Sequence, residues 1–264
     1  MELQQNLNEI QKRGLAVAAI SYDSTAILKD FADRKHISYS LLSDPGSKII
    51  KAFGLLNETI PPGPFYGVPY PGTYILDRDR RVVAKYFEDD YTQRFTASDI
   101  LVKQFGATAG AAHSTAEGKH LRIAASAGTG VVHIGQRLVL VLDISVPHGV
   151  HVYAPGVQGY IPIDLSIPES KSFTIHPAAY PPSKTMRLAA IDETVPVYTD
   201  DFRILREITI SKTAQPGDLP VEGSLRYQAC DEKECFVPET VPLKWTLRVE
   251  ALDRQRVPAE IQHK

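Results

Sequence analysis

The chain contains two cysteines, Cys230 and Cys235, and both lie within one window of six residues. Residues 227–229 are predicted to end a strand, residues 231–234 to form a short charged turn, and residues 236–237 to begin a return strand. Facing positions on such a hairpin bring two Cβ atoms to about 3.5–4.5 Å, the separation that a disulfide needs. The pattern therefore predicts a disulfide across a hairpin.

Such a bond would stabilise the fold only weakly. The chain-entropy model gives roughly 2 kcal/mol for so small a loop, against about 4–5 kcal/mol for a loop of about 100 residues. A redox-active pair needs only proximity and exposure, so the spacing favours thiol–disulfide exchange, and a static hairpin disulfide stays open as the alternative. A structural zinc site is disfavoured because zinc usually takes four ligands and the chain has no second cysteine pair.

The residues around the cysteines resemble the N-terminal domain of the thiol:disulfide interchange protein DsbD, an immunoglobulin-like periplasmic module. That family carries Tyr-Gln-x-Cys, a short acidic insert and Cys-aromatic-x-Pro-x-Thr. The matching residues are Tyr227, Gln228, Cys230, Cys235, Phe236, Pro238 and Thr240. The resemblance covers roughly residues 121–250 and implies an all-β sandwich. It also implies that Cys235 forms a mixed disulfide with a thioredoxin-like protein partner and that Cys230 resolves it.

The same resemblance indicates which residues surround the disulfide. The predicted wall and cap consist of Tyr153, His151, Ile191, Tyr198 and Phe236. His151 and Tyr153 share one face of a predicted strand because side chains alternate along a strand. The family often shields its disulfide with a phenylalanine on a cap loop, whereas the corresponding residues 188–193 offer only Leu188 and Ile191.

The turn between the cysteines is acidic, since Asp231, Glu232 and Glu234 outnumber Lys233. Nearby negative charge disfavours a thiolate, so neither sulfur is expected to be a strong nucleophile at neutral pH. This suits a passive relay whose disulfide is attacked by a more reactive partner thiol and passes through a mixed disulfide.

Length and pattern predict two domains in the 264 residues. Residues 107–119 are small, polar and aperiodic, which is typical of a linker. Before them, in residues 1–106, helical and strand patterns alternate; after them, residues 120–250 are almost entirely short β runs, followed by a tail at 251–264. The predicted fold class is therefore an α/β domain followed by an all-β immunoglobulin-like sandwich.

The first domain resembles the thioredoxin-like redoxin or peroxiredoxin family, AhpC/TSA. Ser24 and Thr96 are predicted helix caps, and residues 15–20 read as a buried strand. The phrases that carry the resemblance lie at residues 18–23, 41–45, 53–54 and 69–77. Pro71 matches the position of the family's cis-proline.

In that family a strand and the catalytic cysteine precede the first helix seen here. The chain begins within or just before that helix, so the domain is expected to lack its central strand and its nucleophile. A truncated reading frame is favoured over a natural half-domain that serves as an interaction module. Residues 15–20 and 73–77 should then lie on either side of a gap one strand wide, or pair directly.

Composition bounds the function. A net charge of −2 gives no electrostatic reason to expect nucleic acid as a partner, and no apolar run reaches the roughly 18 residues of a membrane helix. The first residues lack a basic segment followed by an apolar one, so no signal peptide is predicted. Disulfide exchangers usually work in oxidising compartments, which favours a periplasmic or extracytoplasmic location despite that start.

The sequence therefore predicts a thiol–disulfide oxidoreductase that acts as an electron relay through Cys230 and Cys235. Two alternatives remain: a peroxiredoxin-type peroxidase whose cysteine lies upstream of Met1, and a non-catalytic binding module with a structural disulfide. No cofactor is expected. No metal is expected either, because His148 and His151 would point to opposite faces of a strand.

Overall fold

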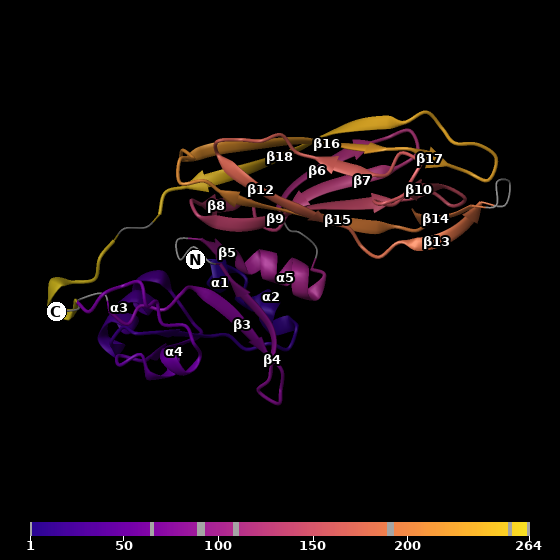
Figure 1. Cartoon of the computed structure of the whole chain (residues 1–264). Coiled ribbons are helices and arrows are strands. Elements are labelled where there is room, and N and C mark those ends of the chain that lie inside the picture. Colours follow the sequence, from indigo (N-terminus) through magenta and orange to yellow (C-terminus); the bar gives the residue numbers. More distant parts are fainter. Residues whose placement is uncertain are drawn as a thin grey trace. The chain divides into compact units, whose positions relative to one another are not determined.

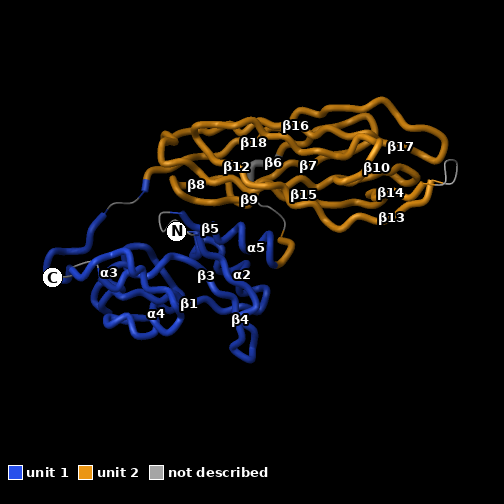
Figure 2. The backbone as a smooth tube through the Cα atoms, in the orientation of Figure 1, with its two compact units in different colours: residues 1–104, 252–264 blue, residues 105–251 orange. Residues whose placement is uncertain are grey.

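The computed structural model describes residues 2–63, 66–88, 93–107, 111–188, 193–252 and 255–262. The chain divides into two compact units (Figure 2): residues 1–104 with 252–264, and residues 105–251. The first unit mixes helices and strands, and the second is built from strands (Figure 1). The predicted order of an α/β unit followed by an all-β unit is confirmed.

The elements of the first unit follow one another in short alternation. They are α1 (Glu2–Gln5), α2 (Leu7–Lys12), β1 (Ala18–Ser21), α3 (Thr25–Lys35), β2 (Ser40–Ser43), α4 (Lys48–Ala52), β3 (Gly72–Leu76), β4 (Val82–Phe87), β5 (Arg94–Phe95) and α5 (Ala97–Phe105). Both predicted caps are confirmed: Ser24 Oγ accepts the backbone N–H of Ile27 at 3.4 Å, and Thr96 Oγ1 accepts that of Asp99 at 3.0 Å. These bonds satisfy backbone donors that a helix start leaves unpaired.

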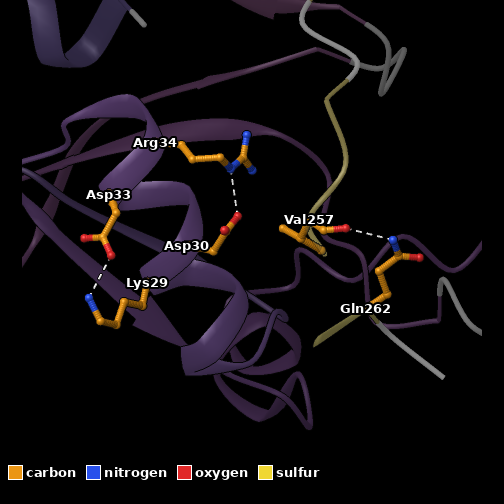
Figure 3. A network of polar contacts seen from close by, with 6 residues as sticks. All are labelled: Lys29, Asp30, Asp33, Arg34, Val257 and Gln262. Carbon is orange, nitrogen blue, oxygen red and sulfur yellow. Dashed lines mark hydrogen bonds and ion pairs between the residues drawn. The ribbon is translucent and has the colours of Figure 1, made fainter. Parts of the chain in front are cut away.

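Two ion pairs follow the surface of α3. Lys29 pairs with Asp33 and Arg34 pairs with Asp30, each at 2.7 Å (Figure 3). Each pair is four residues apart, which places the two side chains on one helix face. Of the tail predicted at 251–264, residues 252–264 group with this unit and contain the short 3-10 turn η1 (Ala259–Ile261).

In the described residues, four strands of the first unit form two separate sheets. β1 pairs with β2 in parallel, and β3 pairs with β4 antiparallel. Direct pairing of β1 with β3, one of the two expected arrangements, is absent from the described residues; the one-strand gap stays a prediction. The cis assignment for Pro71 is wrong, since the described residues contain no cis peptide bond. The trans isomer is the lower in energy by about 0.5–1 kcal/mol for an X–Pro bond.

The second unit contains β6 to β18. Their bounds are β6 (Ala111–Glu117), β7 (Arg122–Ala127), β8 (Val131–His133), β9 (Gln136–Ser145), β10 (His151–Tyr153), β11 (Asp164–Ser166), β12 (Phe173–Ala179), β13 (Lys184–Leu188), β14 (Glu193–Tyr198), β15 (Phe202–Ile210), β16 (Gly217–Tyr227), β17 (Ala229–Cys230) and β18 (Glu239–Glu250). Its three sheets have the orders β12-β15-β9-β7-β6, β11-β16-β18-β8 and β13-β14-β10-β17. The first two are the faces of a sandwich, and the third, smaller sheet carries the cysteines.

The core of the sandwich lies between its two larger sheets (Figure 1). β18 alternates buried and exposed residues along its length, as a strand with one face on a core must. Trp245 on β18 is fully buried, and its Nε1 donates a hydrogen bond to the backbone oxygen of Ser126 on β7 at 2.9 Å. The predicted β-sandwich is therefore confirmed, and this bond joins its two layers.

The linker predicted at residues 107–119 is wrong for most of its length. Residues 111–117 form β6, which pairs with β7, and Ser114 Oγ donates to the backbone oxygen of Lys244 at 2.7 Å. The short side chains that suggest a linker instead suit an edge strand, where Ala116 packs against the core and Thr115 faces solvent. Small polar residues carry little pattern, so composition alone misread this strand.

Candidate functional site

The two cysteines close a short hairpin loop and are bonded to each other, with their Cα atoms 4.0 Å apart. Asp231 organises this loop, because its Oδ1 accepts the backbone N–H groups of Lys233 at 2.7 Å and Glu234 at 2.8 Å. The N–H of Phe236 then donates to the carbonyl of Ala229 at 2.8 Å. The predicted hairpin disulfide is therefore confirmed.

The two sulfurs lie in different environments. Cys230 is only 1% exposed and packs with Tyr153, Val195 and Val197 in a small apolar cluster apart from the main core. Cys235, by contrast, is exposed. An incoming nucleophile can therefore reach Cys235, whereas Cys230 is covered by side chains of the small sheet.

Tyr153 lies under the disulfide, as predicted. Its hydroxyl is 3.5 Å from both sulfurs, and because disulfide sulfurs carry no hydrogen, the hydroxyl is the donor. Burial raises the pKa of Tyr153, and the nearby Glu193 carboxylate adds to the shift. The phenol therefore stays protonated at neutral pH and keeps its donor aimed at the sulfurs.

His151 occupies the other predicted wall position. It lies directly opposite Cys230 in the β10–β17 register, and its ring meets that of Tyr153 edge-on with centroids 5.6 Å apart. The side chain is buried, at 7% exposure, and its Nε2 has no hydrogen-bond partner. Burial lowers the pKa of His151, and the negative charge of Asp231 opposes that shift.

Tyr160 adds an outer layer that the sequence did not reveal. Its ring stacks on that of Tyr153 with centroids 4.4 Å apart, and its hydroxyl donates to Glu193 Oε2 at 2.6 Å. This bond raises the pKa of Tyr160 to about 12. Two glycines with positive φ, Gly156 and Gly159, shape the preceding loop. An aromatic residue directly after such glycines was the available signal.

One of the predicted wall residues, Tyr198, lies on the other face of the sheet. Tyr198 lies opposite Val152 in the strand register, so the side chains of Tyr198 and Tyr153 project from opposite faces of the sheet. On its own face Tyr198 stacks on Phe202 and belongs to the main core. Its assignment to the wall is therefore wrong, because side chains of a strand alternate between faces. Ile191 lies outside the described residues. Leu188, at the end of β13, packs against the small cluster.

Phe236 anchors the segment that leaves the site towards β18. Its ring stacks on His120 with centroids 3.9 Å apart and packs against the main core. The loop carrying His120 is held by Glu239, whose carboxylate accepts the hydroxyl of Tyr227 at 2.6 Å and the backbone N–H of Lys119 at 2.9 Å. The residue after Cys235 is thus tied to the body of the sandwich.

The charge in the turn stays negative at neutral pH. Hydrogen bonds from the backbone N–H groups of Glu234 and Lys233 hold the pKa of Asp231 below its usual value. An ionised carboxylate next to Cys230 disfavours a thiolate there.

Within the described ranges no cluster of three or more His, Cys, Asp or Glu residues could hold a metal ion. None of the helices in those ranges has the length and apolarity to span a membrane.

Comparison with known proteins bears on both units. Residues 126–244 match the family model "Thiol:disulfide interchange protein DsbD, N-terminal", and residues 1–85 match the AhpC/TSA family. Both predicted resemblances are confirmed. The second unit is thus a DsbD-like β-sandwich, and the first is a thioredoxin-like fragment.

Curated relatives of the chain include peroxiredoxins. Peroxiredoxin Bcp of Escherichia coli K12 is 29% identical over 93 residues, which cover 34% of this chain and 56% of that protein. Chloroplastic peroxiredoxin Q of Arabidopsis thaliana is 38% identical over 72 residues, or 27% of this chain and 31% of that protein. The chain thus spans about half or less of the length of these relatives.

Solved structures with some likeness include two bacterial domains. The N-terminal periplasmic domain of ScsB from Proteus mirabilis has 14% identity and a TM-score of 0.37, covering 53% of this chain and 52% of that one. The reduced DsbD N-terminal domain of Neisseria meningitidis has 15% identity and a TM-score of 0.28, covering 41% of this chain and 77% of that one. The two family matches support a thiol–disulfide redox function for the chain.

The position of Tyr153 predicts a role for its hydroxyl in exchange. Tyr153→Phe should slow the reduction of the disulfide by dithiothreitol about tenfold, because a hydrogen bond to a developing thiolate is worth about 1.5 kcal/mol. The rate can be followed by quenching with acid and alkylating the free thiols. Tyr198→Phe is the matched control, a buried tyrosine on the opposite face; an equal slowing in both variants would contradict the role.

Proposed function

We propose that the second unit is a thiol–disulfide relay that works in the periplasm or another extracytoplasmic compartment. The thiolate of a thioredoxin-like partner attacks the exposed Cys235, the Cys230–Cys235 bond breaks, and Cys230 leaves as the thiolate. A second partner thiolate then attacks the partner's own sulfur in the mixed disulfide and releases Cys235. The partner dithiol is oxidised by two electrons and the chain's disulfide is reduced. In the other half of the cycle, an oxidised acceptor forms a mixed disulfide with Cys235, and the Cys230 thiolate attacks Cys235, re-forms the Cys230–Cys235 bond and releases the acceptor as a thiolate.

The difference in exposure between the two sulfurs carries this proposal. Cys230 is 1% exposed and Cys235 is exposed, so Cys235 is the cysteine that a partner can approach. Exchange needs access to one sulfur and a good leaving group at the other. A static staple would need neither an open sulfur nor a hydroxyl placed against both sulfurs.

The acidic turn determines the direction of attack. Ionised Asp231 and the neighbouring Glu232 and Glu234 disfavour thiolates at the cysteines. The pair is thus suited to be attacked by a more reactive partner and poorly suited to attack unassisted. All cysteine chemistry of this chain lies in the second unit, because its only two cysteines are there.

The reduction potential of the disulfide tests the relay. Structural disulfides of secreted proteins have potentials below about −300 mV, and a relay must lie above that value to be reduced by thioredoxin-class donors. We expect the oxidised full chain, equilibrated in dithiothreitol redox buffers and then alkylated, to give a potential above about −300 mV. Far-UV circular dichroism should show that the reduced protein stays folded.

A bond that survives excess reduced thioredoxin would overturn the relay and leave a structural disulfide. Loss of β-structure on reduction would have the same meaning, since a relay must remain folded in both redox states.

A further inference from the structure

The histidine beside the disulfide has an unused ring nitrogen. His151 lies directly opposite Cys230 on the adjacent antiparallel strand, and directly opposite residues have Cβ atoms about 4.5–5.5 Å apart. Its Nε2 is buried without a hydrogen-bond partner. Leaving a buried polar atom unpaired is energetically unfavourable, so such an atom calls for an explanation. A bonding partner that appears only in another redox state would provide one.

The reduced state creates such a partner. When the disulfide opens, the sulfur of Cys230 remains among the buried side chains of Tyr153, Val195 and Val197. Apolar surroundings favour the neutral thiol over the thiolate, yet only the thiolate exchanges with disulfides. A proton must therefore leave Cys230 each time it attacks and return each time it is released.

We propose that His151 exchanges this proton with Cys230, acting as its base when Cys230 resolves a mixed disulfide and as its acid in the reverse step. The inference deepens the proposed relay and rests on it. In the resolving step, Nε2 takes the proton of the Cys230 thiol, the Cys230 sulfur bonds to Cys235, and the Cys235–partner bond breaks. The partner sulfur leaves as a thiolate, and His151 passes the proton to the buffer. Bonds and electrons balance, since one disulfide replaces another.

The other titratable groups around His151 are less suited to this task. Burial raises the pKa of Tyr153, so its hydroxyl stays protonated and serves as a donor. Asp231 is held ionised by two backbone N–H groups, and both of them donate to its Oδ1. Tyr160 and Glu193 are bonded to each other at 2.6 Å. Among these groups, His151 lies directly opposite Cys230 and has a ring nitrogen, Nε2, without a hydrogen-bond partner. Because burial lowers the pKa of His151, its ring is neutral at pH 7 and can act as a base.

The resolving step can be measured alone. The reduced full chain is mixed with oxidised glutathione, which forms a mixed disulfide at Cys235, and the release of the second glutathione is followed by rapid quench and mass spectrometry between pH 5 and pH 9. In the wild type, the rate of the resolving step should rise with pH around the pKa of His151 and then level off. Burial places that pKa below the ordinary value of histidine. In His151→Gln the rate at pH 7 should fall at least about tenfold. Its pH dependence should move to that of a cysteine thiol, at about pH 8.5 or above.

Two further variants serve as controls for this experiment. His148→Gln removes an exposed histidine just before β10 and should behave as the wild type. His151→Asn, which is smaller than glutamine, should reproduce the altered pH profile if His151→Gln is poorly folded by circular dichroism. A purely structural role would leave the pH profile unchanged in any folded variant.

The outcomes separate this inference from the relay itself. If wild-type Cys230 resolves the mixed disulfide and the His151 variants show the same pH profile, the inference is wrong and the relay stands. If the wild type never forms or never resolves the mixed disulfide, the relay fails and the inference fails with it.

Discussion

Replacing Cys230 with alanine should convert a transient exchange into a stable covalent complex. Cys235 remains exposed in Cys230→Ala, so a thioredoxin-like donor with its own resolving cysteine removed should be trapped as a mixed disulfide after activation with dithionitrobenzoate. Cys235→Ala should give no complex, because Cys230 is 1% exposed and lies within the cluster of Tyr153 and Val197. Non-reducing electrophoresis and mass spectrometry of the full chain measure both results.

The controls for this trapping experiment follow from the difference in exposure between Cys230 and Cys235. The complex of Cys230→Ala should disappear on reduction, and the double variant should trap nothing. Equal trapping by Cys230→Ala and Cys235→Ala would mean that the pocket does not protect Cys230, and the assigned order of attack would be wrong. Trapping through Cys230 alone would reverse the roles of the two sulfurs.

The hairpin was predictable because its determinants are local. Two cysteines five residues apart with a charged turn between them can meet without help from the rest of the chain, and Asp231 supplies the bonds that shape the turn. The helix caps at Ser24 and Thr96 were predictable for the same reason, since a cap bonds to backbone only three residues away.

The wall of the site was harder to predict because it depends on pairing between distant strands. Tyr198 follows a motif that resembles the family's, but the register with Val152 directs its side chain to the other face. Tyr160 reaches the site from a loop shaped by glycines, and no period in the sequence marks such a loop. The alternation of side chains along a strand shows which residues of that strand share a face. It does not show which residues of a second strand lie on the same face of the sheet.

The strand β6 was mistaken for a linker for a related reason. Most side chains of residues 111–117 are small or polar, and this composition resembles that of a linker. Their strand character comes from pairing with β7 and from the bond between Ser114 and the Lys244 backbone, 130 residues away. Long-range pairing of this kind leaves little trace in a local window.

Replacing Trp245 with alanine should destabilise the sandwich far more than removing the disulfide. Truncating a buried tryptophan typically costs about 3–5 kcal/mol. Trp245 is fully buried, and its Nε1 bonds to Ser126 across the two sheets. The double variant Cys230→Ala/Cys235→Ala should lose about 2 kcal/mol or less, because the loop it opens is short. Since the chain has two units, hydrogen exchange of peptides from β9 and β16 should be used to report the opening of this unit alone.

Val237→Ala is the control for this comparison. Val237, two residues after Cys235, is 86% exposed, so its truncation should change the stability by no more than about 0.5 kcal/mol. If the double cysteine variant costs as much as Trp245→Ala, the bond is a staple, and the reduced protein could not survive as a carrier of electrons. If the cost is small, the sandwich holds its shape in both redox states because Trp245 and the surrounding core, and not the disulfide, stabilise it. A relay requires that separation, since the bond that carries the electrons must break in every cycle while Tyr153 and His151 stay in place around it.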